Sequence, residues 1–165
     1  MNELPKRINN RLVEFDYSQN GAYFVTICTK DRECILSEVV GGGVLDAPQM
    51  QLTKYGIIVD NQIKEINDTY TNLNIDKYVI MPNHVHLIVV VCHENGTSRT
   101  PSPTNAVIPR FVSTLKRFTN KKCGFNLWQR SFHDHIIRNQ PDYDRIWQYI
   151  DENPIKWELD KYYVE

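Results

Sequence analysis

A chain of 165 residues, with 41% hydrophobic and 24% charged residues, predicts one folded domain over residues 1–165 rather than two domains or a disordered chain. No apolar run reaches the roughly 18 residues that span a bilayer, and residues 1–7 lack the apolar core of a signal peptide, so we expect a soluble, cytoplasmic protein. The net charge of −1 gives by itself no indication of a nucleic-acid partner.

The four cysteines are irregularly spaced and include no pair separated by two residues. That spacing argues against a zinc finger and against a framework of disulfides. We interpret Cys28, Cys34, Cys92 and Cys123 as small residues that are buried or partly buried.

The first predicted elements are a strand and a helix with an insertion between them. Residues 21–29 are rich in β-branched and aromatic side chains and predict a strand. Three glycines begin the segment 41–48, which predicts a flexible insertion. Residues 53–69 have apolar side chains at the spacing of an amphipathic helix.

A hairpin and an exposed linker follow. Residues 76–81 and 84–92 predict two strands, because Pro82 and Asn83 interrupt the strand pattern between them. Residues 93–106 are rich in Ser, Thr, Pro and Asn and predict a linker on the surface.

The second half of the chain predicts helix, strand and helix. Phe111, Leu115 and Phe118 follow a helical period, residues 132–138 predict a fourth strand, and a last helix starts near Asp142 as its N-cap. The order β-α-β-β-α-β predicts an α+β, ferredoxin-like fold, an antiparallel sheet with two helices on one face. We expect the additional C-terminal helix to pack where it can face the sheet.

The basic residues are concentrated in one segment. Residues 107–140 carry a net charge of about +6 within a chain whose net charge is −1. Such a stripe suits a phosphate backbone, although a solvated helix face gives the same pattern. The basic residues of this segment are Arg110, Lys116, Arg117, Lys121, Lys122, Arg130 and Arg138.

Two histidines lie at the start of the predicted strand over residues 84–92. His84 and His86 are two apart on a strand and therefore project to one face, while Val85 and Leu87 point to the other. Two neighbouring imidazoles can share one divalent ion. Taken alone, the pair favours two structural histidines over metal ligands.

The C-terminal helix offers a second set of chemical groups. Tyr149 and Asn153 are four apart and share one helix face, so a phenolic oxygen lies one turn from an amide oxygen. Pro154 disturbs the helix directly after Asn153. The alternative is an aromatic stripe in which Tyr149 is a core residue.

Several segments resemble a known family. Residues 78–87, Tyr-Val-Ile-Met-Pro-Asn-His-Val-His-Leu, resemble the signature strand of single-tyrosine HUH transposases. Residues 127–130 and 134–138 resemble motifs of the insertion-sequence-200-like branch associated with repetitive extragenic palindromes (REPs), and residues 142–156 resemble its nucleophile helix. The similarity runs in register over nearly the whole chain, but the insertion at 41–48 is not part of the family's core pattern.

The resemblance implies a DNA transposase and endonuclease that cleaves and rejoins single-stranded or hairpin DNA through a 5′-phosphotyrosine. It implies Tyr149 as the nucleophile, with Mg²⁺ or Mn²⁺ held by His84, His86 and Asn153. Three other tyrosines are competitors for the nucleophile: Tyr143, Tyr162 and Tyr163.

The basic residues listed above are then candidate contacts to the DNA backbone, and we expect the protein to associate with the nucleoid when it is bound to DNA. Trp128 is a candidate for stacking on a base, or else a buried structural residue, and His135 is a candidate helper of the nucleophile or a structural histidine. Some members of the wider family form homodimers with shared sites, whereas the closer branch can work as a monomer, so the sequence leaves both states open.

Three alternatives remain at this point: a domesticated endonuclease that processes DNA hairpins, a non-catalytic DNA-binding module, and a metal hydrolase that activates water. A covalent DNA adduct separates the first of these from the other two, because only an attacking side chain leaves one.

Overall fold

The core of the protein is a four-stranded antiparallel sheet in the order β4-β5-β1-β6. The computed structural model describes residues 20–41, 47–92 and 107–164. The strands in chain order are β1 Gly21–Cys28, β4 Leu73–Ile80, β5 His84–Val91 and β6 His133–Ile137. The helices are α1 Lys54–Thr69, α2 Val107–Cys123 and α3 Gln140–Glu152. This β-α-β-β-α-β order followed by a helix confirms the predicted ferredoxin-like arrangement.

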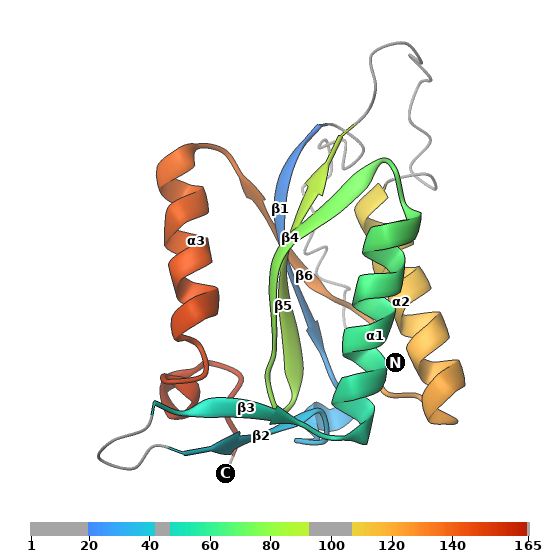
Figure 1. The fold of residues 1–165 in the computed structure, drawn as a ribbon, viewed down its shortest axis with the longest axis vertical. Coiled ribbons are helices and arrows are strands. Elements are labelled where there is room, and N and C mark those ends of the chain that lie inside the picture. Colours follow the sequence, from blue (N-terminus) through green and yellow to red (C-terminus); the bar gives the residue numbers. More distant parts are fainter. Residues whose placement is uncertain (1–19, 42–46, 93–106, 165) are drawn as a thin grey trace, which may run out of the picture.

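The sheet separates two layers of helices. Helices α1 and α2 cover one face of the sheet and α3 covers the other (Figure 1). Alternation along β5 sends Val85 and Leu87 into the large core cluster beneath α1 and α2. Ile88 points the other way and packs against Ile146 and Ile150 of α3. The C-terminal helix therefore faces the side of β5 to which His84 and His86 belong.

Helix α3 begins earlier than the sequence predicts. The side chain of Asn139 accepts a hydrogen bond from the backbone N–H of Asp142 at 2.9 Å and is the N-cap. The predicted N-cap at Asp142 is wrong, because Pro141 fits in the first turn of a helix, where no N–H is needed. After α3 the chain turns through the short 3₁₀ helix η3, Trp157–Leu159.

A small hairpin flanks the predicted flexible insertion. Strands β2 (Ser37–Val40) and β3 (Gln49–Leu52) pair antiparallel on either side of it. Residues 42–46 within the insertion, and the predicted linker 93–106, lie outside the described residues. A second 3₁₀ helix, η1 (Lys30–Arg32), follows β1.

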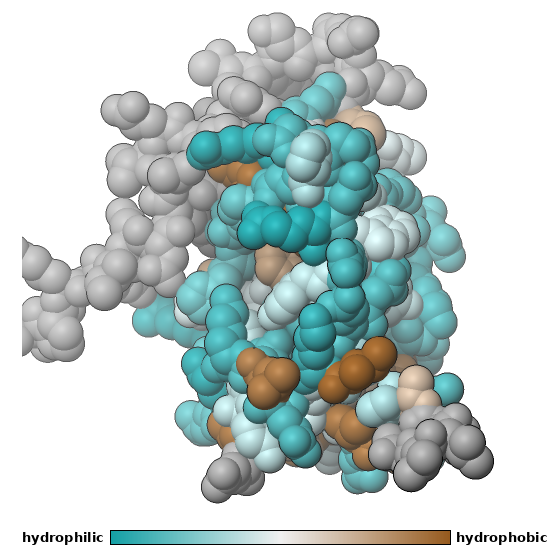
Figure 2. Space-filling view, turned by 90° about the vertical axis from the view of Figure 1, so that its left-hand side faces the viewer, coloured by the Kyte–Doolittle hydropathy of each residue, from teal (hydrophilic) through white to brown (hydrophobic). Residues whose placement is uncertain are grey.

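The burial of the cysteines and the character of the surface can be compared with the predictions. Cys28 is buried and Cys123 half-buried as expected, but Cys34 and Cys92 are exposed. Among the described helices, none is long and apolar enough to cross a membrane. The face formed by α3 is largely hydrophilic, and hydrophobic side chains gather at its lower end (Figure 2). Exposed hydrophobic residues after α3 include Ile155 and Leu159.

Candidate active site

The two histidines at the start of β5 lie side by side and are fully buried. Their Nε2 atoms are 3.0 Å apart, and their ring centroids are 4.4 Å apart. Two nitrogens at this spacing match adjacent ligands of a single ion bound at about 2.1 Å. Alternation along β5 thus places the imidazoles of His84 and His86 as the sequence predicted.

Asn83 fixes the tautomer of His84. The amide nitrogen of Asn83 donates to the backbone carbonyl oxygen of Tyr162 at 2.8 Å and, at 3.4 Å, to that of Arg32. Carbonyl oxygens only accept, so the Asn83 side-chain oxygen must face Nδ1 of His84, 2.8 Å away. Nδ1 of His84 therefore carries the hydrogen, and its Nε2 has a free lone pair.

Thr26 contacts the other imidazole from the neighbouring strand. Thr26 of β1 lies opposite His86 in the sheet, and its hydroxyl is 2.8 Å from Nδ1 of His86. The hydroxyl can donate to Nδ1 or accept from it, so both tautomers of His86 are open. When Nδ1 donates, Nε2 of His86 has a lone pair that points at the lone pair of His84. That arrangement is stable only with a cation between them; otherwise His86 shares its Nε2 hydrogen with His84.

The surroundings of the histidines keep them neutral. Burial lowers the pKa of both His84 and His86, and the proximity of His84 lowers the pKa of His86 further. A metal ion binds the neutral imidazole. The site therefore suits two neutral histidines that bind a metal ion better than it suits two charged histidines.

Asn153 supplies an oxygen without a partner. This residue caps the C-terminal end of α3 and is only 2% exposed. Its side-chain oxygen is one of two buried side-chain polar atoms, among the described residues, that have no hydrogen-bond partner. An unpaired buried acceptor costs about 1–3 kcal/mol, and a bound cation would remove that cost. The donor set of two imidazole nitrogens and one amide oxygen thus fits a divalent ion.

Tyr149 presents its hydroxyl to the same place. The hydroxyl oxygen is 3.4 Å from Nε2 of His86, and the ring makes an edge contact with Phe24 at 6.0 Å between centroids. The side chain is 38% exposed, so the predicted core role does not describe it. Burial raises the pKa of the phenol, the neighbouring Asn153 side chain lowers it, and a hydrogen bond to Asp160 raises it.

Asp160 is a carboxylate of this site that the sequence did not indicate. Its Oδ2 accepts a hydrogen bond from the Tyr149 hydroxyl at 2.9 Å, and its Oδ1 accepts one from the N–H of Tyr162 at 2.7 Å. With His84 and His86 it forms a group whose ligand atoms lie within 4.8 Å of one another. No motif marks it, because its position depends on the turn that folds the chain back after α3.

The other tyrosines lie in different environments. The Tyr143 hydroxyl donates to Asp76 at 2.8 Å. Burial and this hydrogen bond raise the pKa of Tyr143 to about 12. Tyr162 is buried with its ring centroid 4.7 Å from that of His84. Tyr163 packs on Trp157 at 5.3 Å. Of the tyrosine hydroxyls in the described residues, that of Tyr149 is the one with a hydrogen-bond contact to a site histidine.

Some of the predicted DNA contacts are bound to other groups of the protein, and others are exposed. Lys116 donates to the backbone oxygens of Gln129 at 2.6 Å and Ser131 at 2.9 Å, and burial lowers its pKa to about 8. It therefore holds a turn rather than reaching for a ligand. Lys122 pairs with Glu65 at 3.1 Å on the surface. Three others are exposed: Lys121, Arg130 and Arg138.

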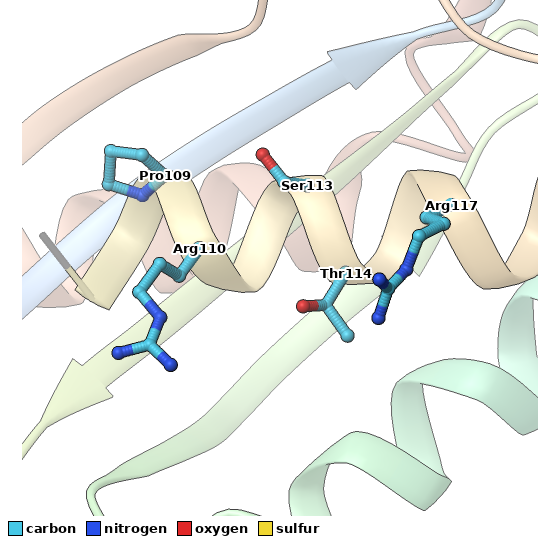
Figure 3. A pocket seen from close by; sticks show the side chains of 5 residues that line it. All are labelled: Pro109, Arg110, Ser113, Thr114 and Arg117. Atoms are coloured by element: carbon cyan, nitrogen blue, oxygen red, sulfur yellow. The ribbon is translucent and has the colours of Figure 1, made fainter. Parts of the chain in front are cut away.

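A hollow on α2 contains two of the predicted arginines. Figure 3 shows Arg110 and Arg117 with Thr114 between them along the helix. Helix α2 lies on the face of the sheet opposite α3, so this hollow is remote from the histidines (Figure 1).

Trp128 does not offer a stacking surface. Its side chain is 2% exposed, and its indole N–H donates to the Thr119 hydroxyl at 2.7 Å. The expectation that Trp128 stacks on a base is therefore corrected, since the ring fills the core beneath α2.

A pocket opens beside Tyr149 and contains basic residues that the sequence did not single out. Besides Tyr149 its lining includes Phe24, His135, Arg145 and Lys161. His135 does not bond to the nucleophile candidate, because its Nε2 lies 2.8 Å from the carboxylate of Asp142. The pocket gives Tyr149 an approach from solvent that is lined by the basic side chains of Arg145 and Lys161, of which Arg145 also forms an ion pair with Asp142.

Comparison with known proteins identifies relatives of the chain. No protein-family model matches it. An uncharacterised protein of Haemophilus influenzae is 32% identical over 174 residues, which cover 94% of this chain and 92% of that protein. A REP-associated tyrosine transposase of Escherichia coli K12 is 28% identical over 141 residues, covering 85% and 70%.

A solved structure shares the fold. The structure of a REP-associated tyrosine transposase bound to a REP hairpin superposes with a TM-score of 0.61 at 23% identity. The superposition covers 98% of this chain and 77% of that one.

Proposed function

The chain belongs to the family of REP-associated tyrosine transposases, and we propose that it cleaves and rejoins single-stranded DNA through a 5′-phosphotyrosine with the help of a divalent ion. The observation that carries this proposal is the Tyr149 hydroxyl 3.4 Å from Nε2 of His86. A nucleophile of the correct type therefore stands beside two neutral imidazoles. DNA transposition is the process in which we place this reaction.

The metal would be held by His84, His86 and Asn153. When bound, a divalent ion polarises a non-bridging oxygen of the scissile phosphate and holds that phosphate in place. The hydrogen bonds of Asn83 and Thr26 aim the imidazoles. Mg²⁺ is the abundant choice, and nitrogen ligands suit Mn²⁺ as well or better.

The remaining groups of the site bind and position. The ring contact with Phe24 limits the movement of the Tyr149 ring, while Arg145 and Lys161 attract the phosphate backbone to the pocket. Because one chain brings its own Tyr149 to its own histidines, we propose that the reaction proceeds within a single copy.

A DNA hairpin is the partner that we propose, by analogy with the relative that was solved bound to a REP hairpin. Because α2 and α3 cover opposite faces of the sheet, the basic residues of α2 would contact the DNA outside the cleavage site, and Arg130 and Arg138, which flank β6, would extend these contacts. These contacts then serve affinity rather than chemistry. The proposed contacts are Arg110, Arg117, Lys121, Lys122, Arg130 and Arg138.

An adduct assay tests the proposal. Labelled hairpin DNA is incubated with the protein and Mn²⁺, and a protein–DNA band is sought on a denaturing gel. We expect a band with the natural chain and with Tyr143→Phe, and none with Tyr149→Phe or in the presence of a chelator. Cleavage without any band contradicts the proposal and indicates attack by activated water instead.

A further inference from the structure

We propose that Asp160 is a catalytic residue of this site, the carboxylate that receives the phenolic proton of Tyr149 as its oxygen attacks the phosphate. The inference deepens the proposed function and rests on it, because it concerns the same nucleophile. A phenol is a weak nucleophile until a base removes its proton.

The carboxylate is already in hydrogen-bond contact with the nucleophile. The Tyr149 hydroxyl donates to Oδ2 of Asp160 at 2.9 Å, within the range in which a general base acts. The other oxygen, Oδ1, accepts from the N–H of Tyr162 at 2.7 Å. The backbone N–H of Asp160 itself donates to the carbonyl oxygen of Trp157 at 3.0 Å. The turn after α3 therefore holds the carboxylate in a fixed orientation toward the phenol.

Competing roles for the nearby groups are resolved by their hydrogen bonds. Each oxygen of Asp160 already accepts a hydrogen bond, whereas the side-chain oxygen of Asn153 has no partner. The unpartnered oxygen of Asn153 gains most from a cation, so we assign the ion to Asn153. Asp160 also lies within the group of ligand atoms around His84 and His86, but its Oδ2 already holds the phenolic hydrogen, so we assign the proton to Asp160. Nε2 of His86 is a longer contact of the phenol, at 3.4 Å, and its lone pair is needed for the ion.

His135, the helper considered from the sequence, is committed elsewhere. Its Nε2 lies 2.8 Å from Oδ2 of Asp142, at the edge of the pocket. Among the described residues, Asp160 is thus the carboxylate that contacts the Tyr149 hydroxyl.

The proposed step balances without any further reactant. The O–H bond of Tyr149 breaks and its proton passes to Oδ2 of Asp160. The phenolic oxygen forms a bond to phosphorus while the bond from phosphorus to the 3′ oxygen of the DNA breaks. That oxygen leaves with the electron pair and takes a proton from water, and protonated Asp160 releases its proton to solvent. The products are a 5′-phosphotyrosine and a 3′-hydroxyl.

The decisive variant is Asp160→Asn, since an amide of the same shape still accepts a hydrogen bond from the phenol but is not a base. With hairpin DNA and Mn²⁺, we expect the rate of adduct formation to fall about 10²- to 10³-fold. Mn²⁺ affinity, measured by calorimetry, and hairpin affinity should stay as in the natural chain. Glu158→Gln removes an exposed carboxylate from the same segment and is the matched control, with no change expected.

Formate addition gives a second readout that a structural role would not move. Asp160→Ala leaves space at the phenol, and added formate should restore part of the rate there but not in Asp160→Asn. A normal adduct rate in Asp160→Asn overturns the inference, and so does a loss of Mn²⁺ affinity, which makes Asp160 a ligand. If the natural chain itself forms no adduct, the proposed function fails rather than the assignment within it.

Discussion

Acid should destabilise the metal-free protein through its two buried histidines. His84 and His86 are fully buried, and burial lowers the pKa of each below its ordinary value. In the unfolded chain both imidazoles take up protons near pH 6.5. A base whose pKa is lowered by folding gives full stability above that pH, and stability is lost as the pH falls.

The size of the effect follows from the number of protons taken up. At about pH 5, roughly 1.5 pH units below the pKa in the unfolded chain, each imidazole that stays neutral in the folded protein lowers the free energy of unfolding by about 2 kcal/mol relative to neutral pH. The two together cost up to about 4 kcal/mol, a large part of the stability of a small domain. Asp142 does not interfere, because its pKa is lowered to about 2 and its contribution is lost only at more acid pH.

Urea unfolding with a chelator present, at several pH values between about 8 and 5, measures this loss. We expect a level free energy of unfolding above pH 7 and a steady decline below it. The decline should be about halved in His86→Gln. A level profile down to pH 5, or an unchanged slope in the double variant His84→Gln with His86→Gln, would refute the reasoning.

Further predictions concern the support of the site and the DNA contacts. Asn83→Ala should lower Mn²⁺ affinity about 10- to 100-fold in calorimetry, because His84 loses the partner that fixes its tautomer; unchanged affinity would contradict this. Trp128→Phe should cost about 1–2 kcal/mol of stability in urea unfolding through loss of the bond to Thr119, while hairpin affinity, measured at a temperature where the variant is folded, stays constant. Arg110→Ala should weaken hairpin binding and lower the salt dependence by about one ion, yet leave the adduct rate at saturating DNA unchanged; a slower rate there would place Arg110 in the site.

The order of the elements was predictable because each has a clear period. Strands of alternating or β-branched residues and helices of regular apolar spacing give β-α-β-β-α-β directly. The hairpin of β2 and β3 was missed because its strands have only four residues each, too few to establish a period, and because β2 shows no alternating pattern of burial. The start of α3 was misplaced since Asn139, Asp142 and Pro141 all occur near a helix start, and only geometry shows which side chain caps it.

The histidines and Tyr149 could be named from spacing and family resemblance, but not all of their surroundings. Asp160 lies in a turn without a motif, and its contact with Tyr149 exists only because the chain folds back after α3. For Trp128 the sequence left two readings, and burial beneath α2 decides against stacking. The sequence shows only that Lys116 is basic, which made it a candidate DNA contact. The folded chain places its ammonium group against backbone carbonyls, and this contact is not visible in the sequence.

The most direct test of the account is the identity of the residue that carries DNA after cleavage. The hairpin adduct is formed with Mn²⁺ and digested with a protease, and its peptides are analysed by mass spectrometry. We predict a 5′-phosphate linked to the peptide that contains Tyr149. A phosphate on Tyr143, Tyr162 or Tyr163, or cleaved DNA with no modified peptide, would contradict the central claim.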